Sequence, residues 1–241
     1  MKYKLRRIIG LLILCGGVIT YLLINPNSYE EVPVSSESDT EIVLANSGIT
    51  ESSPKASDVL ARLGVKGRAP KTDYARTEFY DDWPNIDGCS LRQKIIKREF
   101  GDSAKLNGCD VVSGEYDEPY TGQHKVFTEK SAISKGVQID HVVALSNAWQ
   151  TGAQYKTPEE RYNLATDPLN LLAVDSSANQ QKSDGDAATW LPSNKSFRCQ
   201  YAARQIAVKY KYALWVTSAE HDALANILSA CPDEKSPGVS L

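Results

Sequence analysis

Two apolar, β-branched runs constrain the fold more than any other feature of this chain. Residues 136–143 and 169–174 are rich in the valine, isoleucine and leucine side chains that are typical of buried strands. The segment between them carries two short helix patterns, the first over residues 144–154. A capped polar stretch then predicts a helix over residues 175–190. The order strand, helical insertion, strand, helix therefore defines a core motif over residues 136–190.

Polar side chains stand at set points of this motif and indicate one kind of chemistry. Asp140 and His141 are adjacent on the first run, Asn170 lies on the second, and Asn179 and Lys182 follow on the predicted helix. Hydrolysis of a phosphodiester needs an activated water and charge neutralisation at phosphorus. We expect His141 to act as general base, Asp140 and Asn179 to hold one Mg²⁺ or Mn²⁺ ion, Asn170 to brace the loop, and Lys182 to contact a phosphate.

The Asp140-His141 pair sets a geometric condition on this hypothesis. Successive side chains of a regular strand point to opposite faces of the sheet. For both residues to serve one site, the strand must end or bulge at the pair. We therefore predict an irregularity there, just before the Ala144-Leu145-Ser146 segment.

Four stretches of this region also carry a resemblance to a known family. They are Ile139-Asp-His-Val-Val-Ala-Leu145, Ala148-Trp149, Asp167-Pro-Leu-Asn-Leu171 and Ala188-Thr-Trp190-Leu-Pro192. Together with Asn179-Gln-Gln-Lys182 they resemble HNH endonucleases of the ββα-metal superfamily, and in particular an exported bacterial family related to the C-terminal domain of GmrSD-type restriction enzymes. The resemblance extends roughly from Tyr74 to Cys231.

The resemblance implies an α+β fold, with a ββα-metal (HNH) core, a helical insertion and flanking helices. It implies Asp140 as metal ligand, His141 as general base, Asn170 as loop brace and Asn179 as second metal ligand. One departure from the commonest HNH pattern is that asparagine, not histidine, stands at the last position. This variant implies a weaker metal shell.

The N-terminal quarter of the chain does not have the composition of a domain. Basic residues precede the uncharged run 8–24, so residues 1–25 are expected to form a signal anchor or a signal peptide. Residues 26–58 are acidic and polar and predict a disordered linker. The nuclease-type domain is expected over residues 59–241, on the extracellular face of the membrane, held there through residues 8–24, or secreted.

Cysteines support an exported chain. Outside the apolar run, cysteines stand at Cys89, Cys109, Cys199 and Cys231. Four cysteines allow three disulfide pairings, and the short-loop pairing would leave the core motif between two bridged flanks. A zinc site is the alternative, but no two of these cysteines have the close spacing that zinc sites use. We therefore expect two disulfides.

Charge excludes one mode of binding. The net charge is −3, and the part after residue 58 is close to neutral, so broad electrostatic capture of nucleic acid is not expected. Arg92 belongs to a basic cluster on a predicted helix. Such a cluster is by default a solvated face, but Arg92 could line a groove for the phosphate backbone. The expected partner is nucleic acid, with DNA as the substrate.

Two alternatives to a nuclease follow from the same residues. The first is a surface binding module that keeps the nuclease fold without catalysis, which the near-neutral charge and the absent final histidine favour. The second is a zinc-dependent cell-wall hydrolase that uses His124, His141 and Asp140. These three residues lack the close spacing of common zinc motifs, which disfavours the hydrolase.

Overall fold

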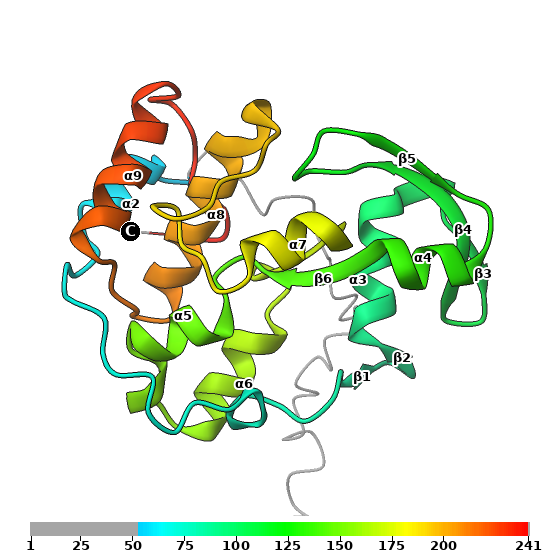
Figure 1. Cartoon of the computed structure of the whole chain (residues 1–241), viewed down its shortest axis with the longest axis horizontal. Helices are drawn as coiled ribbons and strands as arrows, with labels where there is room; N and C mark the ends of the chain where they lie inside the picture. The colour runs from blue at the N-terminus through cyan, green and yellow to red at the C-terminus, as the bar shows by residue number, and fades with distance from the viewer. Residues whose placement is uncertain (1–52, 241) are drawn as a thin grey trace, which may run out of the picture. The chain divides into compact units, whose positions relative to one another are not determined.

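A two-stranded hairpin followed directly by a helix stands at the centre of this computed structural model, which describes residues 53–240 (Figure 1). Strand β6 (Val137–His141) pairs antiparallel with β7 (Leu171–Asp175), and α7 (Ser176–Lys182) begins at the next residue. The helical insertion between the strands consists of α5 (Leu145–Gln150), the 3-10 turn η3 (Ala153–Tyr155) and α6 (Pro158–Thr166). The order of elements is thus the one predicted from the sequence.

Helix α7 is shorter than the helix expected over residues 175–190. The Asp175 side chain caps its first turn by accepting from the Ala178 backbone N–H at 2.8 Å. Its end comes at Ser183, which has a left-handed φ of 51°. Gly185 follows, and a Cβ there would lie 2.9 Å from the Lys182 carbonyl oxygen, so the chain turns where only glycine fits.

The hairpin is buried on both faces, which explains its continuous apolar runs. On one face, Val137, Leu171 and Ala173 pack against Leu91 and Ile95 of α3 (Leu91–Phe100). The other face contributes a second cluster, whose members are Val142, Leu172, Val174, Ala178, Tyr120 and Tyr201. Adjacent residues of β6 therefore enter different environments.

Small sheets and turns surround α3. The strands are β1 (Asn85–Ile86) with β2 (Cys89–Ser90), and β3 (Lys105–Asn107), β4 (Asp110–Asp117) and β5 (His124–Phe127) in a three-stranded antiparallel sheet. The 3-10 turn η2 (Gly101–Ser103) leads from α3 into β3, and helix α4 (Lys130–Gly136) leads from β5 into β6. A disulfide between Cys89 and Cys109 ties β2 to the β3–β4 turn.

The C-terminal helices form a second packing unit with the start of the described chain. Helices α8 (Arg198–Lys211) and α9 (Ser218–Ser229) pack with α2 (Ala56–Leu60), and the turn η4 (Lys195–Phe197) precedes α8. A second disulfide joins Cys199 to Cys231, so both bridges follow the short-loop pairing. Ala56 is 0% exposed within this core, so the packed chain starts earlier than the boundary predicted at residue 59.

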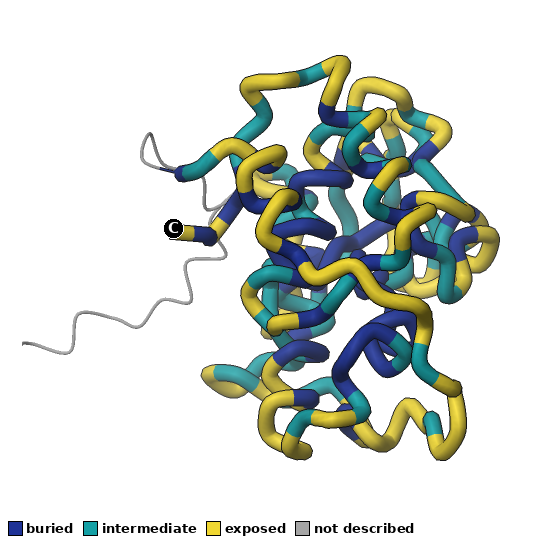
Figure 2. Tube along the Cα trace, turned by 90° about the vertical axis from the view of Figure 1, so that its left-hand side faces the viewer, coloured by how far each residue is buried: buried dark blue, intermediate teal, exposed yellow. Residues whose placement is uncertain are grey.

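An irregular segment, residues 65–84, runs from α2 to β1 along the helical insertion, and we call it the strap (Figure 1). It contains the 3-10 turn η1 (Arg76–Glu78). The indole N–H of Trp149 donates to the Thr72 carbonyl at 3.1 Å, and the Arg161 guanidinium donates to the Glu78 carbonyl at 2.7 Å. These bonds satisfy strap carbonyls that have no strand partner and fix the strap against α5 and α6. Figure 2 shows buried segments in the interior, with exposed loops around them.

Among residues 53–240, none of the helices combines the length and the apolar character that a membrane crossing needs. The predicted signal anchor or signal peptide (1–25) and residues 26–52 of the predicted linker lie outside the described residues. The described part is an α+β fold with small sheets, many helices and two disulfides.

Candidate active site

His141 ends β6 as a buried, neutral imidazole. Its Nε2 lies 2.9 Å from the carbonyl oxygen of Ala165 on α6, and a carbonyl only accepts, so Nε2 carries the proton. Burial and, to a smaller extent, the nearby charge of Arg76 lower the pKa of His141 to about 3, against the opposing effect of the Ala165 hydrogen bond. At neutral pH the Nδ1 atom therefore holds an unshared electron pair. A general base acts from this unprotonated form, but a pKa of about 3 makes the imidazole a weak base in the described arrangement.

Two aromatic side chains of the strap cover the His141 ring. Trp83 stacks on it with ring centroids 5.9 Å apart and planes 9° from parallel. Tyr80 lies with its centroid 6.0 Å away at a tilt of 40°. These contacts restrict rotation of the imidazole and shield it from water. Sequence reasoning missed both residues because no periodic pattern links the strap to β6.

Asn170 braces the loop that follows His141. Its Oδ1 accepts from the Val143 backbone N–H at 2.8 Å, and its Nδ2 donates to the Leu164 carbonyl at 3.2 Å and to the Val143 carbonyl at 3.4 Å. The residue is 0% exposed. The buried Asn170 amide thus links the chain that follows β6 to the end of α6. Helix α6 also carries the Ala165 carbonyl that contacts His141.

Asp140 lies on the opposite face of β6 from His141. Its Oδ2 accepts from the Tyr120 hydroxyl and its Oδ1 accepts from the Lys182 ammonium at 2.9 Å. Burial raises the pKa of Asp140, and the charge of Lys182 opposes that rise. The carboxylate is thus held inside the protein by one cation and one hydroxyl.

The expected irregularity at the Asp140-His141 pair is absent. The β6–β7 register runs without a shift from Val137 opposite Asp175 to His141 opposite Leu171. Strand β6 does end at His141, but both residues of the pair still belong to the ladder, so their side chains alternate. The structure does not bring the two side chains together.

Lys182 is not placed as the phosphate contact that the sequence predicts. It is 1% exposed, and besides Asp140 its ammonium donates to the His141 carbonyl at 2.9 Å. Lys182, at the end of α7, is therefore bonded both to the His141 backbone carbonyl and to the Asp140 carboxylate. Its charge is satisfied inside the protein.

Asn179 lies one helical turn before Lys182 and faces the same strand. Its Nδ2 donates to the Gln138 side chain at 2.9 Å, and Gln138 precedes Asp140 by two residues on β6. Asp140 and Asn179 therefore both border the space between β6 and α7. The structure brings these two predicted ligands to one interface.

The donors at this interface have the chemistry of a divalent-ion site. A carboxylate and an amide oxygen on facing elements are the hard ligands that Mg²⁺ or Mn²⁺ accepts, with water completing the shell. Lys182 supplies the positive charge at Asp140 in the described arrangement. The residue types suit an ion, but an ion at Asp140 would have to displace the ammonium of Lys182 from Oδ1.

Arg92 lies on α3 and is bonded to the β6–β7 hairpin. It donates to the Val137 carbonyl at 3.1 Å, and burial lowers its pKa. Arg98 of the same cluster donates to the Pro168 and Leu171 carbonyls at 3.0 and 2.7 Å. The sequence predicts a phosphate groove at Arg92, whereas in the structure this arginine anchors α3 to β6.

A zinc site built from His124, His141 and Asp140 does not form. His124 is exposed on β5, with its Nδ1 2.8 Å from an Asp117 carboxylate oxygen. Within the described residues, three possible ligands gather only at Cys199, Cys231 and Glu234, and the two cysteines are bonded to each other. The described part of the chain thus gives no support to the zinc-hydrolase alternative.

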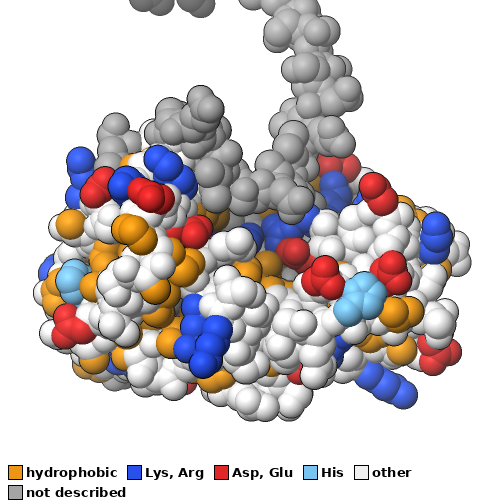
Figure 3. Space-filling model, turned by 90° about the horizontal axis from the view of Figure 1, so that it is seen from above, with side chains coloured by type: hydrophobic (Ala, Val, Ile, Leu, Met, Phe, Trp, Pro, Cys, Tyr) orange, Lys and Arg blue, Asp and Glu red, His pale blue; other side chains and the backbone are white. Residues whose placement is uncertain are grey.

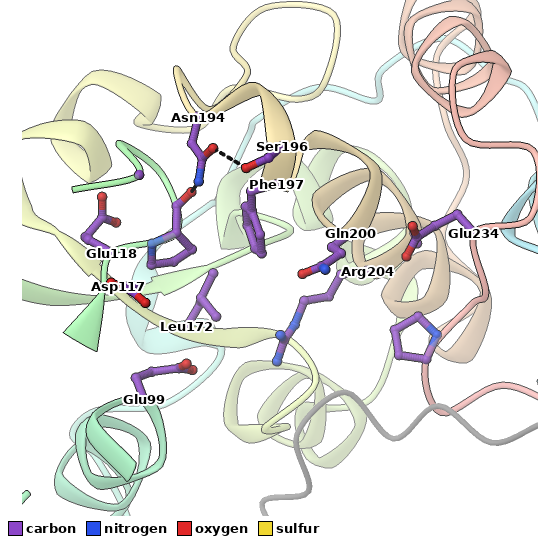
Figure 4. A pocket seen from close by; sticks show the side chains of 14 residues that line it. Glu99, Asp117, Glu118, Leu172, Asn194, Ser196, Phe197, Gln200, Arg204 and Glu234 are labelled. Carbon is purple, nitrogen blue, oxygen red and sulfur yellow. Dashed lines mark hydrogen bonds between the residues drawn. The ribbon is translucent and has the colours of Figure 1, made fainter. Parts of the chain in front are cut away.

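A cavity of about 680 Å³ is lined by none of the site residues that the sequence predicts (Figure 4). Its charged lining consists of Glu99, Asp117, Glu118, Glu234 and Arg204. The Arg204 guanidinium is engaged by the Leu169 carbonyl at 2.6 Å. This acidic lining repels a polyanion. On the face in Figure 3, side chains of both signs are interspersed, which agrees with the near-neutral net charge.

Comparison with known proteins gives the family. The family model described as GmrSD restriction endonucleases, C-terminal domain, matches residues 89–227, more than half of the chain. An "Uncharacterized secreted protein" of Arthroderma benhamiae is 38% identical over 184 residues, covering 75% of this chain and 86% of the relative. Because this alignment spans three quarters of the chain, it includes the strap, which precedes the family match. No solved structure matches. The chain therefore belongs to the family of the C-terminal domain of GmrSD restriction endonucleases.

Proposed function

We propose that this protein hydrolyses phosphodiester bonds of DNA, with His141 as the general base. The observation that carries the proposal is the hydrogen bond from His141 Nε2 to the Ala165 carbonyl. It fixes the tautomer in which Nδ1 accepts a proton, on a ring that burial keeps neutral. Membership of a restriction-endonuclease family supports the same chemistry.

In this mechanism the chain's own residues hold and move one proton. His141 Nδ1 takes the proton from the water that attacks phosphorus, and the Ala165 carbonyl stabilises the imidazolium that forms. Asn170 keeps the backbone on both sides of the base in place. Trp83 limits the rotation of the ring during the transfer. Together these contacts position the base before the substrate arrives.

We further propose that Asp140 and Asn179 hold one Mg²⁺ or Mn²⁺ ion in the space between β6 and α7. A divalent ion there would polarise a phosphoryl oxygen and stabilise the departing 3′ oxygen. For His141 to serve the same phosphate the end of β6 would have to bend, because the described ladder keeps Asp140 and His141 on opposite faces. The support is the placement of both donors at one interface. Asp140 would exchange the ammonium of Lys182 for the ion.

The site of action that we propose is outside the cell. The Arthroderma benhamiae relative is described as secreted, and two disulfides are typical of proteins in oxidising compartments.

A second candidate is a DNA-binding module without catalysis. Two observations favour it: the Asp140 carboxylate is paired with Lys182, and two strap aromatics cover His141. This candidate predicts DNA binding that divalent ions leave unchanged, with no turnover.

Cleavage assays separate the two candidates. The purified chain is incubated with supercoiled plasmid, linear duplex, single-stranded DNA and RNA, with Mg²⁺, with Mn²⁺ or with EDTA. We expect nicking of DNA that EDTA abolishes and that His141→Ala reduces by at least about 100-fold. The matched control is His124→Ala, which removes an exposed histidine of β5 and should cleave normally. Cleavage by His141→Ala at the wild-type rate would contradict the assignment.

A further inference from the structure

Arg76 is an exposed arginine on the strap, next to the covered base. Its guanidinium lies over the Tyr80 ring, 5.0 Å from the centroid, and donates to the Tyr80 hydroxyl. Tyr80 also contacts the base, because its ring centroid lies 6.0 Å from that of His141. One tyrosine therefore holds a cation beside the proposed general base.

Most other cations near β6 and the strap are already engaged, and the strap lysine that has no ion pair among the described residues, Lys66, has its ammonium over the Trp215 ring, 5.2 Å from the centroid. Lys182 is buried against Asp140, and Arg92 is bonded to a β6 carbonyl. On the strap, Arg68 pairs with Asp186 and Lys71 pairs with Asp184. These groups would have to break existing bonds before they could bind an anion.

Arg76 differs from these cations. Among the described residues, no carboxylate lies within ion-pairing distance of its guanidinium, and its one hydrogen-bond partner is the neutral Tyr80 hydroxyl. A guanidinium has five N–H donors in a planar fork, so most of the Arg76 donors remain for a ligand. Contact with the tyrosine ring and hydroxyl orients the fork in advance, which lowers the entropy lost on binding.

We propose that Arg76, oriented by Tyr80, binds a non-bridging oxygen pair of the DNA phosphate that lies next to His141. The inference rests on the proposed function and adds a substrate-binding residue that lies outside residues 89–227. A phosphodiester fits this fork because it offers two charged oxygens to parallel N–H donors. The charge effect of Arg76 on His141 agrees with their proximity.

The strap also carries an acidic residue whose removal should have the opposite effect on DNA binding. Asp82 is exposed two residues after Tyr80. Burial is the main cause of the raised pKa of the Tyr80 hydroxyl, and the nearby charge of Asp82 adds to the rise. An anion bound at Arg76 would be repelled by this carboxylate. Removal of the Asp82 charge should therefore strengthen binding, which a damaged fold would not do.

The experiment measures binding separately from cleavage. Full-length His141→Ala protein is titrated with a short fluorescein-labelled DNA duplex at several salt concentrations, alone and combined with Arg76→Ala, Arg76→Lys or Asp82→Asn. We expect Arg76→Ala to weaken binding about ten-fold and to reduce the slope of log K against log salt by about one. Arg76→Lys should restore the slope but only part of the affinity, and Asp82→Asn should tighten binding.

The matched control is Arg62→Ala, which removes another exposed arginine and should leave affinity and slope unchanged. An Arg76→Ala protein with unchanged affinity and slope, or no DNA binding by the His141→Ala background, would overturn the assignment of Arg76. Cleavage by the otherwise wild-type chain is measured in parallel. Cleavage that Arg76→Ala leaves intact would refute the role of Arg76 and keep the proposed function. Binding that depends on Arg76, without any cleavage, would support the role of Arg76 and refute the proposed function.

Discussion

The two faces of β6 give adjacent residues opposite electrostatic environments. His141 meets aromatic rings and one carbonyl, and burial keeps it neutral. Asp140 meets an ammonium and a hydroxyl, which together hold a buried negative charge. The difference teaches that an unbroken strand ladder keeps two adjacent predicted site residues in separate environments, so their joint action on one phosphate would require the end of β6 to bend.

The largest effect on stability is expected on the Asp140 face. Lys182→Met leaves a buried carboxylate without its cation and should lower the free energy of unfolding by about 3 kcal/mol. The measurement is urea denaturation with and without Mg²⁺, and a bound ion should restore part of the loss. The control Lys97→Met changes an exposed lysine of α3 and should stay within about 0.5 kcal/mol of wild type. Equal stability of the two variants would show that the ion pair contributes little.

The next effect concerns the brace on the His141 face. Asn170→Ala leaves the buried Val143 N–H without its side-chain acceptor and should cost about 2 kcal/mol of unfolding free energy. DNA cleavage should fall more than stability alone explains, because the base loses its fixed position. Asn163→Ala, which removes an exposed amide of α6, is the control. Normal cleavage by Asn170→Ala would separate the brace from catalysis.

The two faces should also respond to pH in opposite directions. The unfolded chain protonates histidine below about pH 6.5, whereas folded His141 stays neutral down to about pH 3. Stability from this group is therefore complete above pH 6.5 and falls by about 1.4 kcal/mol per pH unit below it. The raised pKa of Asp140 works the other way, because the folded state takes up that proton first as the pH falls.

Urea titrations at pH 7, 6 and 5 check this expectation. His141→Asn should show a shallower loss of stability than wild type over this range. Parallel curves for the two proteins would mean that His141 is not buried as a neutral group.

The smallest expected effect comes from the strap. Trp83→Ala should rehydrate His141 and raise its pKa toward the ordinary value, so the acid limb of kcat/KM should move to higher pH. Trp83→Phe keeps a ring at this position and should stay close to wild type. An acid limb that is the same in all three proteins would remove the strap from the account of the base.

Much of the core motif was readable from local patterns. Strands β6 and β7 follow from their β-branched runs, and two disulfides follow from the even number of cysteines, whereas the choice of the short-loop pairing came from the structure. Asn170 stands where a loop brace is expected, because its position after Asp167-Pro168 is set by the local chain. These features depend on residues that are close in sequence.

The features that sequence reasoning missed depend on residues distant in sequence. Trp83 and Tyr80 reach His141 across the strap, and no periodicity announces that contact. The sequence predicts a phosphate contact for Lys182, but the packing of α7 on β6 buries this lysine, and it pairs with Asp140. The functional hypothesis required a break in the β6 ladder at Asp140-His141. The ladder is regular there, so the two side chains alternate as in any strand.

The rate of His141→Ala across a range of Mg²⁺ concentrations tests the central claim most directly. Single-turnover nicking of supercoiled plasmid is measured beside Asp140→Asn, in proteins with matched unfolding midpoints. The account predicts that His141→Ala stays at least about 100-fold below wild type at every Mg²⁺ concentration, because an ion cannot replace the base, whereas Asp140→Asn recovers in part as Mg²⁺ rises. Recovery of His141→Ala to the wild-type rate would contradict the division of tasks between the two faces of β6.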